Sequence, residues 1–384
     1  MTQMIPFIDL QAQRRRLGEP LNRAIAAAVE SGQWILGPQV RVLEEQLAEF
    51  ARVKHCVACA NGTDALLLVL RAWEIGPGDA VFVPAFTFAA SAEVVALVGA
   101  TPVFVDVLED TYNVDPKNFE AAIAMVKREG KHTPRAIMPV DLFGQPADYR
   151  LIEPIAAREN LKLLVDTAQA FGATLDGRQT ASIGDAAGTS FFPAKPLGCY
   201  GDGGATFTND SGLAELLRSL RMHGQGNDKY ENVRIGVNSR LDTIQAAILS
   251  EKLKIFPEEI EMRERVARRY TEAFRRSNRV RPPHVIDGAQ STWAQYTIQV
   301  PDRGKLAADL KAKGIPTAIY YPTPLSQQKG YAHFPSVGTP VSDRISGQVI
   351  SLPMHPYLDE ATQDRIIAAV LESAALTVVP TSEF

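Results

Sequence analysis

Between about residues 54 and 208, short β-rich runs alternate with segments of helical periodicity. Alternation of this kind favours an α/β domain with a mainly parallel sheet that is covered by helices on both faces. Ligands bind such sheets beyond the carboxyl ends of the strands. The predicted strands are 56–60, 80–84, 102–107, 135–140, 162–166, 188–192 and 204–208, and the predicted helices lie near 63–74, 89–98, 117–128, 148–159 and 212–221.

The length of 384 residues is too great for one ordinary hydrophobic core, so we expect two domains. A large domain, 1–255, begins with a helical segment, and a smaller α+β domain, 256–384, follows it. A helical stretch from 241 to about 274 spans the boundary and is predicted to be interrupted at Pro257, because proline has no N–H. The smaller domain is predicted to contain strands at 294–300 and near 317–321, and helices at about 304–313 and 359–372.

Charge and composition argue against several classes of protein. A formal net charge of −4 and a pI near 5.9 disfavour a nucleic-acid binder. No run approaches the ~20 apolar residues of a membrane span, and the first residues do not resemble a signal peptide. We therefore expect a cytoplasmic protein. Cys56 and Cys59 lie in a segment predicted to be a buried strand, and no second ligand pair follows, so we expect no metal site.

One lysine, Lys195, follows an apolar strand that is predicted to end at Phe192. The lysine lies in a loop rich in proline and glycine. Gly201, Gly203 and Gly204 allow the backbone of this loop to turn tightly and to approach a ligand. A partly desolvated amine in such a loop suits a Schiff base to an aldehyde cofactor. The alternative, for this residue alone, is an ordinary solvated surface charge.

A candidate phosphate site lies where the first predicted strand gives way to a helix. Gly62 and Thr63 expose backbone N–H groups there, and the helix dipole favours an anion. The alternative is ordinary N-capping by Thr63 or Asp64. Ser190, five positions before Lys195, offers a hydroxyl group for the same phosphate.

Three further residues suit a planar cofactor ring. Phe88 lies just beyond the second predicted strand, where it is either an aromatic core residue or a stacking partner for the ring. Asp166 ends an apolar strand, and a buried charge needs a partner. It either caps a helix or keeps a pyridine nitrogen protonated, which makes the ring an electron sink. Gln169, one turn further on, lies within reach of the same ring.

Taken together, these segments resemble the DegT/StrS family of pyridoxal-phosphate nucleotide-sugar aminotransferases, which have the aspartate-aminotransferase fold. The resemblance extends over almost the whole chain. So many motifs in one order are highly specific for the family and less specific for the substrate. The motifs are at residues 34–38, 61–66, 84–88, 143–148, 166–170, 190–204, 221–225, 238–242 and 352–356.

The resemblance implies a role for each of these residues. Lys195 is implied to form the internal aldimine with pyridoxal 5′-phosphate and to act as acid and base while the cofactor passes through its pyridoxamine form. Asp166 is implied to hold the pyridinium. The implied active unit is a homodimer with shared active sites. The other implied cofactor contacts are Gly62, Thr63, Phe88, Gln169, Ser190 and, from the neighbouring subunit, Asn238.

The implied reaction is a two-stage transamination, in which L-glutamate leaves as 2-oxoglutarate and a nucleotide-linked keto-sugar receives the nitrogen. Residues 191–205 and 234–243 look most similar to one branch. That branch aminates C3 of UDP-2-acetamido-2-deoxy-3-keto-glucuronate for bacterial surface polysaccharides such as O-antigen lipopolysaccharide. The alternatives are a 4-aminotransferase for a UDP- or GDP-4-keto-6-deoxyhexose, of the perosamine type, and a non-catalytic cofactor-binding regulator. Family members that dehydrate sugars have histidine in place of Lys195, so aminotransfer is favoured.

The expected substrate-binding residues are Arg240, Tyr320 and Tyr321. Arg240 can pair with a sugar carboxylate in a bidentate fork. The alternative for Arg240 is an ion pair with Asp242 or with a structural carboxylate. The sequence also departs from the family at the expected border of the sugar pocket, where frequent histidines are replaced by Asp141, Tyr320 and Ser326.

Overall fold

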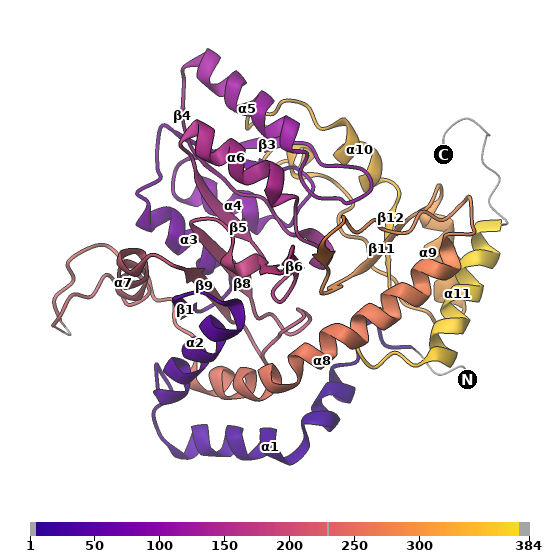
Figure 1. Cartoon of the computed structure of the whole chain (residues 1–384), viewed down its shortest axis with the longest axis horizontal. Helices are drawn as coiled ribbons and strands as arrows, with labels where there is room; N and C mark the ends of the chain where they lie inside the picture. Colours follow the sequence, from indigo (N-terminus) through magenta and orange to yellow (C-terminus); the bar gives the residue numbers. More distant parts are fainter. Residues whose placement is uncertain (1–4, 229, 376–384) are drawn as a thin grey trace.

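The computed structural model describes residues 5–228 and 230–375, and its centre is a seven-stranded sheet (Figure 1). Six strands run parallel, while β9 is antiparallel to both of its neighbours. The predicted α/β fold with a mainly parallel sheet is therefore confirmed. From one edge to the other the strands are β1 (His55–Cys59), β9 (Gly204–Thr208), β8 (Ala186–Ser190), β5 (Lys162–Asp166), β4 (Thr133–Ile137), β2 (Asp79–Pro84) and β3 (Thr101–Val105).

Helices cover both faces of this sheet, because alternate residues of each strand point to opposite faces. In β2, Phe82 packs into the core on one face, whereas Val81 and Val83 pack into the core on the other. The first face is covered by α2 (Pro38–Ala51), α5 (Pro116–Glu129), α6 (Tyr149–Glu159) and part of α8 (Thr243–Phe274). The second face is covered by α3 (Gly62–Ala72), α4 (Ala90–Leu97) and α7 (Ser211–Leu220).

Helix α8 continues through Pro257, so the predicted interruption is wrong. Proline removes one backbone hydrogen bond, but its neighbours on both sides are held by tertiary packing. Phe256 and Ile260 are buried against the sheet core, and Tyr270 lies in the core of a smaller unit. Burial of these side chains outweighs the local propensity to end the helix. The proposed domain boundary at 255 and 256 thus falls inside one helix.

The smaller unit has its own core around a two-stranded antiparallel sheet, β11 (Tyr296–Gln299) and β12 (Val349–Leu352), with α9 (Arg303–Ala312) and α11 (Glu360–Ala375). The strand predicted near 317–321 is wrong, since only Ala318 forms an isolated bridge, with Ser351. Pro316 and Pro322 flank that segment and lack the N–H groups that a sheet ladder needs. The partner of β11 is instead β12, which the sequence pattern did not indicate.

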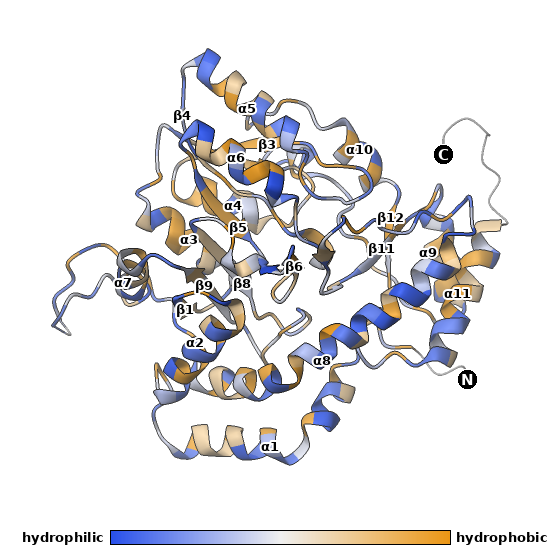
Figure 2. Ribbon diagram, viewed as in Figure 1, coloured by the Kyte–Doolittle hydropathy of each residue, from blue (hydrophilic) through white to orange (hydrophobic). Residues whose placement is uncertain are grey.

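The remaining elements lie at the periphery. Helix α1 (Leu10–Glu30) packs along α8, and both helices carry hydrophilic as well as hydrophobic residues (Figures 1 and 2). None of the helices in the described part of the chain is long and apolar enough to span a bilayer. The other peripheral elements are α10 (Pro340–Ser346) and a small sheet of β10 (Ala289–Gln290), β6 (Thr174–Leu175) and β7 (Arg178–Gln179).

Candidate active site

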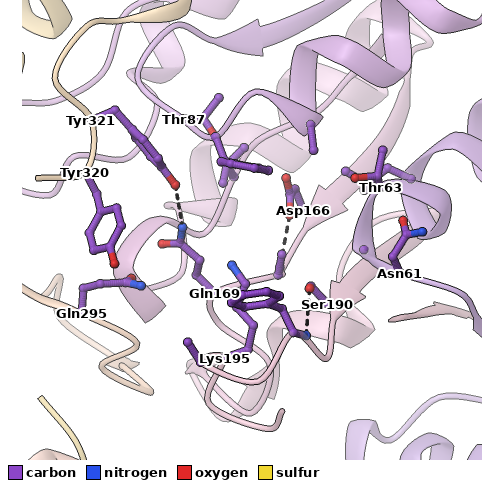
Figure 3. Close-up of a pocket in the computed structure, with 18 of the residues that line it drawn as sticks. Asn61, Thr63, Thr87, Asp166, Gln169, Ser190, Lys195, Gln295, Tyr320 and Tyr321 are labelled. Carbon is purple, nitrogen blue, oxygen red and sulfur yellow. Dashed lines mark hydrogen bonds between the residues drawn. The ribbon is translucent and has the colours of Figure 1, made fainter. Parts of the chain in front are cut away.

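A cavity of about 420 Å³ lies beyond the carboxyl ends of β5 and β8 (Figure 3). Nine of the eleven residues predicted to form the site line this cavity, and the other two, Asn238 and Arg240, do not. Residues distant in the sequence meet here because the parallel strands end at the same edge of the sheet. The nine residues are Gly62, Thr63, Phe88, Asp166, Gln169, Ser190, Lys195, Tyr320 and Tyr321.

One end of the cavity is a backbone cradle at the start of α3. The N-cap of this helix is Asn61, whose Oδ1 accepts a hydrogen bond from the backbone N–H of Asp64 at 2.8 Å, so capping by Thr63 or Asp64 is not what the structure shows. The first amides of a helix lack intrahelical acceptors. A Cβ on Gly62 would lie 2.6 Å from the Cβ of Ser190, so only glycine allows this close approach. The cradle therefore presents amides beside a serine hydroxyl group.

At the end of β5, two hydrogen bonds hold the carboxylate of Asp166. Ser91 Oγ donates to Oδ2 at 2.8 Å, and the backbone N–H of Ala168 donates to Oδ1 at 3.1 Å. Burial raises the pKa of Asp166, while these two donors and the charge of Lys195 act in the opposite direction. The side chain is buried and faces the cavity. It is thus oriented for a cationic partner that the cavity would admit.

Replacing Ser91 with alanine is expected to slow turnover about tenfold, because the carboxylate of Asp166 loses one of its donors. The pKa of Asp166 would rise further, so the acidic limb of the pH–rate profile should move to higher pH. Ser182→Ala is the matched control, since the hydroxyl of Ser182 donates to Gln179 O at 2.7 Å and does not line the cavity. An unshifted pH profile in Ser91→Ala would contradict this role.

Lys195 lies in a tight loop that follows β8, which ends at Ser190 rather than at the predicted Phe192. The backbone N–H of Lys195 donates to Phe192 O at 2.8 Å and closes a turn. Burial lowers the pKa of the Lys195 amine, and the negative charge of Asp166 opposes this effect. A larger fraction of neutral amine, which is the nucleophilic form, follows from the lowered pKa.

Two residues of helix α8 hold the backbone of this lysine loop in place. Gln245 Oε1 accepts a hydrogen bond from the backbone N–H of Tyr200 at 2.8 Å. The ammonium group of Lys252 donates to Gly198 O and lies 4.5 Å from the centre of the Tyr200 ring. Burial lowers the pKa of Lys252 to about 8. Both contacts fix the backbone that follows Lys195, and neither Gln245 nor Lys252 was predicted from the sequence motifs.

The aromatic and amide side chains form the other end of the cavity. Phe88 is 57% exposed, so it is not a core residue. Its ring centre lies 6.3 Å from that of Tyr321. Gln169 is held at both ends, because its Oε1 accepts from the backbone N–H of Phe143 at 2.7 Å and its Nε2 donates to the Tyr321 hydroxyl at 3.1 Å. Gln169 therefore fixes the tyrosine relative to β5.

Several expectations about the rim are revised by the structure. Asp141 is fully buried and does not line the cavity, and its Oδ1 accepts from the Tyr149 hydroxyl at 2.7 Å. Ser326 contacts Thr339 and does not line the cavity either. Only Tyr320 of the three departures from the family pattern reaches it. Further cavity residues, which are not among the predicted site residues, include Thr87, Asp202 and Gln295.

The two remaining predicted residues, Asn238 and Arg240, lie on a segment outside this cavity. Asn238 is exposed and Arg240 is half-buried, whereas the residues beside them, Ser239 and Leu241, are buried. Within the described ranges Arg240 has no ion pair, so the alternative pairing with Asp242 is not seen. The side chains of Asn238 and Arg240 therefore share one accessible side of the chain.

Comparison with known proteins gives consistent matches over the full fold. A model of the DegT/DnrJ/EryC1/StrS aminotransferase family matches residues 16–371. The UDP-2-acetamido-2-deoxy-3-oxo-D-glucuronate aminotransferase of Pseudomonas aeruginosa is 48% identical over 369 residues, covering 96% of this chain and 99% of that protein. The crystal structure of a DegT DnrJ EryC1 StrS aminotransferase from Brucella abortus has a TM-score of 0.94 at 54% identity, covering 95% and 98% of the two chains.

A more distant relative was solved with a cofactor bound. The crystal structure of NtdA from Bacillus subtilis with bound cofactor PMP has a TM-score of 0.87 at 27% identity, covering 98% of this chain and 86% of that one. The resemblance that the sequence motifs indicated is thereby confirmed, as is the enzyme class. The chain belongs to the DegT/DnrJ/EryC1/StrS family of PLP-dependent sugar aminotransferases.

Proposed function

We propose that the enzyme moves an amino group from L-glutamate to C3 of UDP-2-acetamido-2-deoxy-3-keto-glucuronate, for the synthesis of a bacterial surface polysaccharide. This assignment of the substrate rests on the 48% identity, over nearly the whole of both chains, to the Pseudomonas aeruginosa enzyme named for that sugar. The cavity supports the reaction class, because an amine, a buried carboxylate and an amide cradle converge on one space.

The residues of the cavity fit pyridoxal phosphate. The cradle at Gly62 and Thr63, with the hydroxyl of Ser190, would hold the phosphate. Asp166 would accept a hydrogen bond from the protonated pyridine nitrogen, and Phe88 would cover one face of the ring. Gln169 lies next to the same ring position. When bound, this cofactor supplies an electron sink for the breaking of bonds at the carbon that carries the nitrogen.

We assign two chemical roles to the amine of Lys195. In the resting enzyme its Nζ would bond covalently to the aldehyde carbon of the cofactor. During turnover the free Nζ would hold and move a proton next to the carbon that carries the nitrogen. The lowered pKa of Lys195 supports both steps, because only the neutral amine can attack carbon or accept a proton.

A homodimer with shared sites is the second part of the proposal. The segment before Asn238 exposes large apolar residues, with Val233 at 50% and Ile235 at 84% exposure. Exposed apolar side chains on a projecting segment suit a protein interface. In that arrangement Asn238 would contact the phosphate in the partner's cavity. Arg240, on the same side of the segment, would reach the sugar carboxylate there.

Mixed dimers test the sharing of sites. Lys195→Ala and Asn238→Ala subunits, each poorly active alone, are mixed and allowed to exchange. A mixed dimer would have one site with an intact lysine and an intact partner asparagine, so statistical exchange should restore about a quarter of the wild-type activity at limiting cofactor. Activity that stays at the level of the separate variants would place Asn238 at the site of its own subunit.

The reaction itself is tested by absorbance spectroscopy. The purified protein, incubated with pyridoxal phosphate, should show a visible band that L-glutamate removes and that the UDP-3-keto-uronate restores. UDP- and GDP-4-keto-6-deoxyhexoses are the comparison substrates. If they restored the band and the uronate did not, the C3 assignment would be wrong. If L-glutamate had no effect on the band, the proposed amino donor would be wrong.

A further inference from the structure

We propose that Gln295 is a specificity residue, whose side-chain oxygen accepts a hydrogen bond from an uncharged donor on the acceptor sugar. The donor is either the N–H of the 2-acetamido group or a ring hydroxyl group. This inference rests on the proposed function and adds a residue that selects the sugar. Gln295 lines the cavity and lies just before β11, so it comes from the smaller unit.

The first observation is its position in the cavity. Gln295 and Tyr320 lie at one end, while Thr63 and Ser190 lie at the other (Figure 3). If the cofactor phosphate occupies the amide cradle at Thr63, the end with Gln295 is left for the group that the cofactor acts on. A side chain there meets substrate rather than phosphate.

The second observation is an unsatisfied acceptor. Gln295 Oε1 is buried and has no hydrogen-bond partner within the described residues. The other cavity glutamine, Gln169, has partners for both its oxygen and its nitrogen. A buried carbonyl oxygen without a donor is destabilising and therefore uncommon. At the wall of a ligand cavity, a donor on the ligand would satisfy it.

The third observation is that the backbone around Gln295 is anchored to Phe143 and Gln169, beside the place expected for the cofactor ring. The backbone N–H of Gln295 donates to Phe143 O at 3.3 Å. Thr292 Oγ1 donates to Gln169 O at 3.1 Å. Gln295 is therefore held at a fixed position relative to Gln169. A hydrogen bond from a sugar substituent to Gln295 would then fix the position of the reacting carbon of the sugar in the cavity.

The chemistry of the wall selects an uncharged group. The side chains at this end are the carboxamide of Gln295, the phenols of Tyr320 and Tyr321 and the ring of Phe88, none of which is cationic. The oxygen of Gln295, which has no partner among the described residues, can only accept a hydrogen bond, so it cannot bind a carboxylate, which gains more from an arginine. An amide N–H or a hydroxyl group supplies the donor that the free oxygen lacks.

The test compares Gln295→Met with the wild-type holoenzyme. Methionine has a similar length and no hydrogen-bonding amide. We expect KM for the keto-sugar nucleotide to rise about tenfold, which corresponds to one lost hydrogen bond, and the single-turnover rate with L-glutamate to stay within about twofold. Gln290→Met, on the outer strand β10, is the matched control and should leave both values unchanged.

An acceptor analogue that lacks the acetamido group identifies the donor. If the acetamido N–H is bound, the analogue should lose affinity for the wild type but not for Gln295→Met. Equal losses for both proteins would assign the contact to a hydroxyl group. An unchanged KM in Gln295→Met, or equal slowing of both half-reactions, would overturn the proposal. A wild-type enzyme without any response to L-glutamate would instead overturn the proposed function.

Discussion

Lys195→Ala is expected to lower the rate of both half-reactions by about 10⁴-fold, because the variant loses the group that moves the proton. The cofactor should still bind, since the amide cradle and Asp166 do not depend on the lysine. Single-turnover absorbance with L-glutamate, and then with the keto-sugar nucleotide, measures each half-reaction separately. Equilibrium dialysis of pyridoxal phosphate measures the retained binding.

The control for this variant is Lys254→Ala, which removes an exposed amine from α8 that pairs only with Glu251 in the described structure. That variant should behave like the wild type. Activity of Lys195→Ala above a tenth of the wild-type rate would mean that another base moves the proton. Restoration of activity by a small primary amine added to Lys195→Ala would support the role, because the cavity would again hold an amine near the reacting carbon.

Asp166→Asn is expected to slow turnover about 10²- to 10³-fold, because a neutral amide cannot stabilise a positive charge on the ring nitrogen. The same change should raise the Tm of the cofactor-free protein. Burial raises the pKa of Asp166, so its stabilising contribution is present below the ordinary carboxyl pKa and is lost as pH rises through the folded-state pKa. At neutral pH the carboxylate is therefore destabilising, and asparagine relieves this cost.

Calorimetry of the cofactor-free proteins and steady-state kinetics of the holoenzymes check both parts of this prediction. Asp176→Asn is the control, because Asp176 is a surface carboxylate near Arg150 and remote from the cavity lining. A wild-type rate in Asp166→Asn would show that another group protonates the ring nitrogen. A lower Tm in the variant would show that the hydrogen bond from Ser91 stabilises the carboxylate by more than burial destabilises it.

Local patterns predicted the strands and the lysine loop well. The predicted strands 162–166 and 204–208 coincide with β5 and β9, since apolar runs bounded by turn residues carry this information in the sequence itself. Asp166 and Ser190, at the ends of the parallel strands β5 and β8, then converge because parallel strands end at the same edge of the sheet. The cavity lining could be anticipated to that extent.

Features that depend on long-range packing could not be anticipated in the same way. Pro257 suggested a break that burial of its neighbours on α8 overcomes. Gln295 sits in an ordinary strand-like run, and only the docking of the smaller unit turns it toward the cavity. Ser91 follows Thr87 by one turn, but its bond to Asp166 joins two separate elements. Asp141 is buried by contacts that its sequence neighbours do not reveal.

Helix α8 is a rigid mechanical connection between the two halves of the molecule. Near its start, Gln245 and Lys252 form hydrogen bonds with the loop of Lys195. Near its end, Tyr270 and Phe274 lie in the core of the smaller unit. Because one helix contacts both parts, a tilt of α8 would move the loop of Lys195 and the smaller unit that carries Gln295 together. At Pro257 the helical hydrogen bonds lack one N–H donor. A bend of α8 at this residue would let its two ends move independently.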